Sequence, residues 1–274
     1  MVDRNQELKG KVAIVTGAGA AGGLGIRMVR TLAEAGAQVV MTGRREKELV
    51  ELCEGLKEDG LDVSCVLAQM KDPESVANIV KFAVDTYGRL DIAVNNAALT
   101  NHPKDLTVEN MDLDAWDEVF TTNAKGYMIL AKYSIPEMRK VGGGSIINIS
   151  SGTSLAGFGM YTAYASTKGA INTMTKYIAT QVAKDQIRCN ALVLGLVATD
   201  VCDHSMPAPL LKIFEDNHIL GRLGSTNDIA EFVRFLASDN SKWITGSLLD
   251  IDGGYYAHQP TSAPIEEFMK QAAA

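Results

Sequence analysis

The feature that most constrains this chain is the regular alternation of short apolar runs with segments of helical apolar spacing. Seven β-branched runs read as strands, at 11–17, 37–43, 62–68, 90–96, 145–151, 187–194 and 247–251. Runs that are apolar without a break are typical of strands covered on both faces, as in parallel sheets. Repetition of strand and helix predicts right-handed βαβ units. We therefore expect an α/β fold, a doubly wound sheet of about seven parallel strands with helices on both faces.

The length of the chain fits one such sheet. With 274 residues, 46% of them apolar, the chain can bury a large core without disulfide or metal support. We expect residues 1–274 to form one domain. Two segments break the alternation: 198–222, which we expect to be a lid over the strand ends, and the tail 255–274, where Pro260 and Pro264 precede a possible short helix.

Charge and cysteine usage restrict the partners. There are 26 basic and 33 acidic residues, a net charge of −7, which argues against a nucleic-acid or anionic-membrane surface. No apolar run approaches the roughly 18 residues of a membrane span, and the start has no apolar signal segment. The four cysteines and four histidines lack metal-type spacing, so we expect reduced thiols and no metal. These features predict a cytoplasmic protein.

A glycine-rich segment, Thr16–Gly25, follows the first strand and precedes a helical pattern. Glycines let a backbone approach a pyrophosphate, which the N–H groups of the helix start then bind. A plain tight turn is the alternative interpretation, because loops collect glycine for turn geometry. The position after the first strand of a βαβ unit favours a Rossmann-type dinucleotide site.

The end of the second strand bears on the choice of nicotinamide cofactor. An acidic residue there would accept a hydrogen bond from the ribose 2′-hydroxyl, but this chain has Gly43, Arg44 and Arg45. A guanidinium suits a 2′-phosphate, so NADP(H) is favoured, with NAD(H) as the alternative. Both arginines could instead simply solvate a helix start.

Tyr164 and Lys168 stand four apart in a helical segment of about 161–184, and therefore on one helical face. A cation about 4 Å from the phenol would stabilise the phenolate form by on the order of 4 kcal/mol. This would lower the pKa of the phenol by roughly three units. This would suit acid–base work at neutrality. Such a pair is common on ordinary helices.

Ser150 and Ser151 end a strand, and the ends of strands are where α/β sheets place their sites. The alternative is that these two serines only cap a turn.

Further motifs follow in order along the chain: Asn95-Asn96-Ala97 after the fourth strand, Asn123 within Thr122–Ala124, Ser151 thirteen residues before Tyr164, Gly195–Thr199 after the sixth strand, and Asp252-Gly253-Gly254 after the seventh. With the glycine segment and the Tyr164-x-x-x-Lys168 pair, the chain resembles the short-chain dehydrogenase/reductase family from about Lys9 to Gly254.

This resemblance implies hydride transfer between a secondary alcohol and a ketone, with an NAD(P)(H) cofactor. Tyr164 would be the general acid or base, and Ser151 would hold the reacting oxygen. Lys168 would lower the pKa of the tyrosine and hold the ribose. Asn123, through a helix irregularity and a water, would complete the proton path to solvent. The cofactor-binding residues would be Gly17, Gly23, Leu24, Gly25, Arg44, Gln69, Met70, Asn96, Tyr164, Lys168, Val197 and Thr199. The substrate residues would be Ser151, Phe158, Tyr164 and Met206.

Four departures from the family pattern concern cofactor contacts. The glycine segment is one residue longer than usual, Gln69 replaces an adenine-side aspartate, Ala98 replaces a glycine, and Leu194 replaces a proline. None removes a catalytic group. They are the one support for an alternative function, a catalytically silent nucleotide-binding or regulatory protein. A lyase or enoyl reductase is disfavoured by the spacing of the tyrosine and lysine.

Apolar residues of 198–222, with Leu155, Phe158 and Met160, favour a hydrophobic substrate, alicyclic or steroid-like. Alternatively they only pack the lid onto the body. The expected long helices 112–140 and 161–184 pair across a twofold axis in family members, which implies a homodimer or homotetramer, although packing within one chain would use the same faces.

Overall fold

The computed structural model describes residues 6–199, 206–259 and 261–273. All seven expected runs form strands of one sheet: β1 (Val12–Val15), β2 (Gln38–Gly43), β3 (Val63–Leu67), β4 (Ile92–Asn95), β5 (Gly144–Ser151), β6 (Ile187–Leu194) and β9 (Leu248–Ile251). Their order is β3-β2-β1-β4-β5-β6-β9, and every pair is parallel. The prediction of a doubly wound parallel sheet is confirmed. The order reverses between β1 and β4, which is where such sheets bind ligands.

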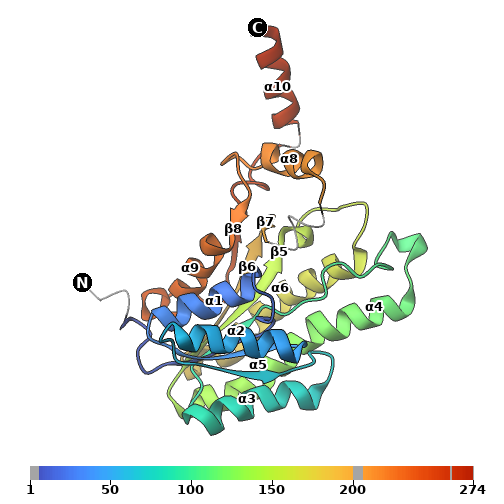
Figure 1. Cartoon of the computed structure of the whole chain (residues 1–274). Helices are drawn as coiled ribbons and strands as arrows, with labels where there is room; N and C mark the ends of the chain where they lie inside the picture. Colours follow the sequence, from blue (N-terminus) through green and yellow to red (C-terminus); the bar gives the residue numbers. More distant parts are fainter. Residues whose placement is uncertain (1–5, 200–205, 260, 274) are drawn as a thin grey trace.

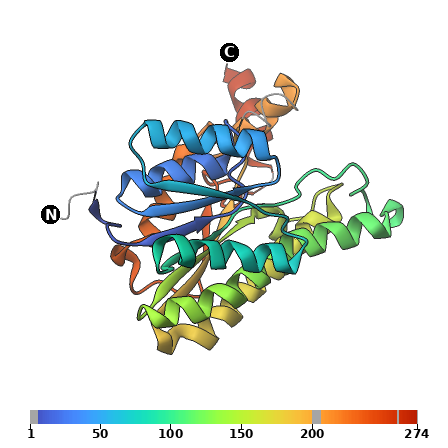
Figure 2. The same ribbon diagram turned by 60° about the horizontal axis from the view of Figure 1, so that its bottom comes forward.

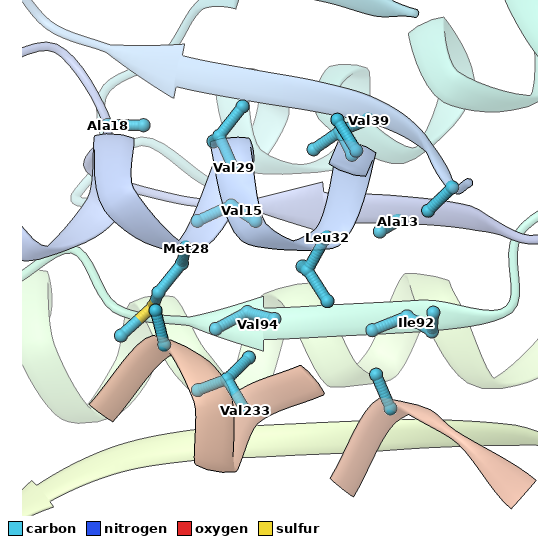
Figure 3. Close-up of a cluster of buried hydrophobic side chains, with 14 of the residues drawn as sticks. Ala13, Val15, Ala18, Met28, Val29, Leu32, Val39, Ile92, Val94 and Val233 are labelled. Carbon is cyan, nitrogen blue, oxygen red and sulfur yellow. The ribbon is translucent and has the colours of Figure 1, made fainter. Parts of the chain in front are cut away.

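Helices cover both faces of the sheet (Figures 1 and 2). One face carries α1 (Leu24–Glu34), α2 (Glu46–Glu58) and α9 (Thr226–Ala237), and the other carries α3 (Pro73–Tyr87), α5 (Gly126–Lys140) and α6 (Thr162–Val182). Figure 3 shows Met28 and Leu32 of α1 and Val233 of α9 meeting Ile92 and Val94 of β4 in the first of these cores. The sheet therefore has two hydrophobic cores, one on each face, and every central strand contributes apolar side chains to both.

The expected long helix 112–140 is interrupted. It consists of α4 (Leu113–Phe120), a π-helical turn (Thr121–Lys125) and α5. Periodicity alone predicted one continuous helix, which is wrong at this turn, whereas the resemblance implied an irregularity at Asn123. Asn123 lies inside the turn and is fully buried. A π-turn inserts one residue and so re-aims the side chains of that turn.

The segment after β6 forms a second, small sheet that the sequence analysis did not expect. β7 (Val197–Ala198) pairs in parallel with β8 (Gly224–Ser225), so the two ends of the expected lid are joined by backbone hydrogen bonds. Residues 200–205 of that segment lie outside the described residues. The described part of the segment contains α8 (Ala208–Asn217).

The tail ends in α10 (Ser262–Ala273), which contacts α8 and points away from the sheet (Figure 1). Pro264 therefore lies in the first turn of this helix instead of ahead of it, which corrects the expectation. Proline is tolerated there because the first N–H groups of a helix lack partners in any case. Pro260 lies outside the described residues.

Shorter elements complete the description. Short 3-10 turns occur at Val108–Asn110, Gly152–Ser154, Ala183–Asp185 and Asp239–Ser241. Across the described ranges, no helix is both long and apolar enough to span a bilayer.

A buried carboxylate, Asp91, fastens the start of β1 to the start of β4. It is 3% exposed, accepts from the Val12 N–H at 3.0 Å, and receives two hydrogen bonds from Arg89 and one from Lys11. Burial alone would raise the pKa of Asp91, but the hydrogen bonds from Arg89 and Val12 and the charge of Lys11 outweigh it, so the pKa lies below its ordinary value.

We expect Asp91→Asn to lower the free energy of unfolding by about 1–3 kcal/mol at neutral pH, since the charge pairing with Arg89 and Lys11 is lost. Because folding lowers this pKa, the contribution is complete above the unfolded value of about 4 and disappears as the pH falls through the folded value. Urea unfolding at neutral and acidic pH measures the difference. Asp59→Asn, which changes an exposed partner of Arg30, is the control; equal effects of both variants would contradict the assignment.

Candidate active site

The predicted site residues gather at the carboxyl ends of β1, β4 and β5, beside the reversal of strand order. Gly17 and Asn96 follow β1 and β4, Ser151 ends β5, and Tyr164 and Lys168 lie on α6, which packs against β5. The fold thus brings residues more than a hundred positions apart to one edge of the sheet.

The glycine segment approaches the backbone after β4 closely. Gly17 has φ +72°, and a Cβ there would lie 2.7 Å from the Cα of Ala97, so only glycine fits. The Asn96 amide donates to the carbonyls of Thr16 (2.8 Å) and Gly17 (3.2 Å). The Thr16 hydroxyl accepts from the Asn96 and Ala97 N–H groups. Asn96 therefore holds the loop in shape, in addition to the adenosine contact implied by the resemblance.

The start of α1 fits a pyrophosphate. Its N-cap is Gly23, no side chain caps the helix, and its first turn carries no acidic residue. The N–H groups of Leu24, Gly25 and the following residue are consequently available to an anion, with the helix dipole in the favourable direction. The longer glycine segment has not removed this feature.

The residues expected at the adenosine side lie at the ends of β2 and β3. Arg44 is exposed. A hydrogen bond from Lys71 is the main cause that lowers the pKa of Glu118, and the charge of Arg44 acts in the same direction. Arg45 donates to the Gly19 carbonyl at 3.1 Å and pairs with Glu48. Arg45 is thus part of the loop structure.

Two further predicted cofactor residues follow β3. Gln69 is exposed, and its N–H donates to the hydroxyl of Ser75. Met70 is 5% exposed and packs on Gly126 of α5. Burial by α5 limits how much of the Met70 side chain a cofactor would touch.

Tyr164 and Lys168 converge as their spacing predicts. Lys168 is 1% exposed; its Nζ donates to the Ile149 carbonyl at 2.7 Å and lies 5.4 Å from the ring centroid of Tyr164. On its other side, Nζ lies 5.3 Å from the ring of Tyr127, a fully buried phenol that donates to the same carbonyl. The ammonium is therefore held between two tyrosine rings at the end of β5.

The pKa of the tyrosine differs from the expectation. Burial raises the pKa of Tyr164, and a hydrogen bond with Ser151 opposes this only in part. Burial also lowers the pKa of Lys168 to about 7. The prediction that Lys168 would lower the phenol pKa by roughly three units is wrong for this structure, because burial removes both groups from water and because Nζ donates a hydrogen bond to the Ile149 carbonyl.

The two serines at the end of β5 have different surroundings. The Ser150 hydroxyl is buried and donates to Asn172 Oδ1 at 2.6 Å, which is a structural role. The Ser151 hydroxyl accepts from the N–H and the hydroxyl of Thr153, so the turn-capping interpretation holds for it. Its hydrogen bond with Tyr164 also places it beside the phenol, so Ser151 has both features.

Asn123 connects the loop after β4 to α6. Its Oδ1 accepts from the Leu99 N–H at 2.7 Å, and its Nδ2 donates to the Leu99 carbonyl at 3.1 Å and to the Thr167 hydroxyl at 3.3 Å. Thr167 in turn donates to the carbonyl of Tyr164. The π-turn aims Asn123 at the helix that carries the phenol.

Sequence reasoning missed Asp105. This carboxylate is 1% exposed and accepts from the N–H groups of Ala163 and Tyr164, both at 2.8 Å. Tyr161, the N-cap of α6, has φ +61° and makes no side-chain cap, so Asp105 caps the helix from a distant loop. In the sequence, Asp105 is a single aspartate in a loop, and no motif around it relates it to Tyr164.

The two other predicted substrate residues lie nearer the surface. Phe158 is 64% exposed and stacks on Tyr161 with 6.4 Å between ring centroids; Met206 precedes α8 and is half-buried. Val197 is in β7. Gly23 and Thr199 line a cavity of about 510 Å³ on the outer side of the glycine segment, which none of the four predicted catalytic residues lines.

The cysteines and the potential metal ligands can be assessed for the described residues. Cys53, Cys65 and Cys189 are free thiols, and Cys202 lies outside the described residues. In the described ranges, no group of three or more His, Cys, Asp or Glu side chains is arranged to hold a metal ion.

Comparison with known proteins identifies the family. A family model described as "Enoyl-(Acyl carrier protein) reductase" matches residues 17–256. A 7alpha-hydroxysteroid dehydrogenase of Paraclostridium sordellii is 38% identical, covering 94% of this chain and 96% of the relative. A probable short-chain type dehydrogenase/reductase of Bradyrhizobium diazoefficiens is 34% identical, with 93% and 90% covered.

Solved structures agree. A putative short-chain alcohol dehydrogenase from Sinorhizobium meliloti superimposes with a TM-score of 0.86 at 31% identity, covering 92% of this chain and 99% of that one. The family's oxidoreductases act on CH–OH or C=O groups with a nicotinamide cofactor. The chain belongs to the short-chain dehydrogenase/reductase family and is an oxidoreductase of that kind.

Proposed function

We propose that this enzyme interconverts a hydrophobic secondary alcohol and its ketone, alicyclic or steroid-like, with NADP(H). The observation that carries the proposal is the convergence of Ser151, Tyr164 and buried Lys168 at the end of β5, next to the uncapped start of α1. The relatives named 7alpha-hydroxysteroid dehydrogenase, from three bacteria, support the substrate class. The exposed Leu155, Phe158 and Met160 beside the site suit an apolar substrate.

The chemistry assigned to each residue follows from its surroundings. A bound nicotinamide would supply or accept the hydride. Because burial raises the pKa of Tyr164, the phenol keeps its proton at neutral pH, which is the form that donates to a ketone oxygen. Ser151 would hydrogen-bond the same oxygen. Lys168, next to the rings of Tyr127 and Tyr164, would stabilise the Tyr164 phenolate left after proton donation. Asn123 would take part in the path that returns a proton to Tyr164.

The choice of NADP(H) depends on Arg44. It is exposed at the end of β2, and no acidic residue follows that strand directly. A guanidinium there would bind a 2′-phosphate with two hydrogen bonds, whereas an NAD(H) ribose would gain little from it.

The remaining assignments are proposals of the same kind. The chain would form one domain with 198–222 as a substrate lid, work in the cytoplasm, and assemble as a homodimer or homotetramer through the helices of 112–140 and 161–184. Met128 and Tyr133 of α5, both exposed on the first of these helices, support the assembly.

Tyr164→Phe is expected to lower kcat by about 10²–10⁴-fold, because it removes the proton donor, and to leave NADPH affinity unchanged. Turnover is followed by the loss of reduced-nicotinamide absorbance and affinity by calorimetry. Tyr177→Phe, the same change at an exposed position of α6, is the control. Full activity of Tyr164→Phe would refute the assigned role, and a wild type that binds NADPH but turns over no ketone would support the silent nucleotide-binding alternative.

Arg44→Ala is expected to raise the KM for NADPH by about tenfold or more, or about 1.4 kcal/mol, with little change for NADH. The matched control is Arg45→Ala, because Arg45 is bonded to Gly19 and Glu48. Steady-state kinetics with both cofactors makes the comparison. A loss shared equally by NADPH and NADH would argue against a phosphate contact.

Asp105→Ala is expected to destabilise the protein by about 1–2 kcal/mol and to lower kcat, because the Tyr164 N–H loses its acceptor. Asp105→Asn keeps one acceptor oxygen and should recover part of both losses. Thermal unfolding and kcat are measured for the two variants, with Asp112→Asn, at an exposed cap of α4, as the control. Wild-type kcat in Asp105→Ala would show that this cap does not position Tyr164.

A further inference from the structure

A third phenol reaches the catalytic end of β5 from the far end of the chain. Gly152 directly follows Ser151 and is buried. A Cβ at Gly152 would lie 1.8 Å from Cε2 of Tyr256 and 2.6 Å from its hydroxyl oxygen. The ring of Tyr256 therefore lies on the backbone next to Ser151, in a space that only glycine leaves open.

The turn after β9 holds Tyr256 in this place. The two carboxylate oxygens of Asp252 accept from the N–H groups of Gly254 and Tyr256, both at 2.9 Å, and its carbonyl accepts from Tyr255. The Tyr255 ring packs edge-to-face on Tyr256 with 4.9 Å between centroids. Backbone hydrogen bonds and ring contact thus fix the direction of the Tyr256 side chain.

The same turn is connected to the lid helix α8. Tyr255 lies 4.8 Å from the ring of His218, which is 3% exposed, and 6.2 Å from Phe214. Because these rings come from α8 and the residue that follows it, the position of α8 and that of Tyr256 depend on each other.

The hydroxyl of Tyr256 lies against Gly152, the residue after Ser151, and keeps its proton at neutral pH, so that it can donate. Burial raises its pKa to about 12, and the Tyr255 phenol, the Asp252 carboxylate and the Tyr164 phenol act in the same direction. Among the described residues, none accepts a hydrogen bond from the Tyr256 hydroxyl, which leaves it for a ligand.

We propose that Tyr256 contacts the substrate and determines specificity: its ring forms the wall beside Ser151, and its hydroxyl donates a hydrogen bond to a second oxygen substituent of the substrate. Ser151 and Tyr164 serve the reacting oxygen. The inference rests on the proposed function and adds a requirement to it, namely that preferred ketones carry another hydroxyl or carbonyl group away from the reacting carbon. A site built to bond such a group discriminates against analogues that lack it.

The test compares wild type, Tyr256→Phe and Tyr256→Ala on a 7-oxosteroid that carries a further ring hydroxyl and on the analogue without that hydroxyl, with NADPH in excess. Tyr256→Phe should lower kcat/KM about tenfold on the hydroxylated steroid, mainly through KM, and change the analogue less than about twofold. Tyr256→Ala, which also removes the wall, should impair both. The Kd for NADPH should be unchanged in both variants.

Tyr177→Phe, an exposed tyrosine of α6, is the matched control and should behave as wild type on both steroids. An unaffected Tyr256→Phe, or an equal loss on the two steroids, would overturn this inference while the proposed function stands. A wild type that reduces neither steroid would overturn the proposed substrate class and this inference with it.

Discussion

The burial of Lys168 beneath the carboxyl end of β5 is the constraint on which the site depends. A charged ammonium is costly to bury, and among the described residues this one contacts the Ile149 carbonyl and the rings of Tyr127 and Tyr164. The same burial that brings its pKa to about 7 also keeps water from the neighbouring phenol. Lysine and tyrosine therefore form one buried unit, in which desolvation shifts the pKa of each group toward its neutral form.

That unit is held by residues from distant parts of the chain. Asn123 reaches it from the π-turn through Thr167, and Asp105 reaches it from the loop after β4 by capping α6. Both connections involve the loop after β4, which begins beside the glycine segment. Asp105 belongs to this loop, and Asn123 hydrogen-bonds the backbone of Leu99 in it. Cofactor loop and catalytic helix are consequently parts of one hydrogen-bonded framework, which is how a proton donor can be kept in register with a bound ring.

The lid side of the site has a different construction. It consists of aromatic contacts and turns instead of a polar network: Phe158 stacks on Tyr161, and Tyr255 joins α8 to Tyr256. Ring contacts tolerate sliding better than buried hydrogen bonds do. Hydrogen bonds thus hold the catalytic residues, and aromatic rings form the side of the site where we propose that the substrate binds.

The sequence by itself determined the strands, their parallel arrangement and the Tyr164–Lys168 face, because these follow from local periodicity and from spacing along one helix. It also located the glycine segment, whose features depend on neighbouring residues such as Gly17 and Leu24. The tertiary structure alone decided the direction of the Tyr164 pKa shift, since desolvation depends on what covers the phenol.

Only the tertiary structure could show the roles of Asp105 and Tyr256. Asp105 lies 59 positions from Tyr164, and Tyr256 lies 104 positions from Gly152, so no local pattern connects either pair. The π-turn at Asn123 likewise became visible only in the structure, where it separates α4 from α5. Periodicity records which face of an element is buried, whereas contacts between elements arise only when the sheet assembles.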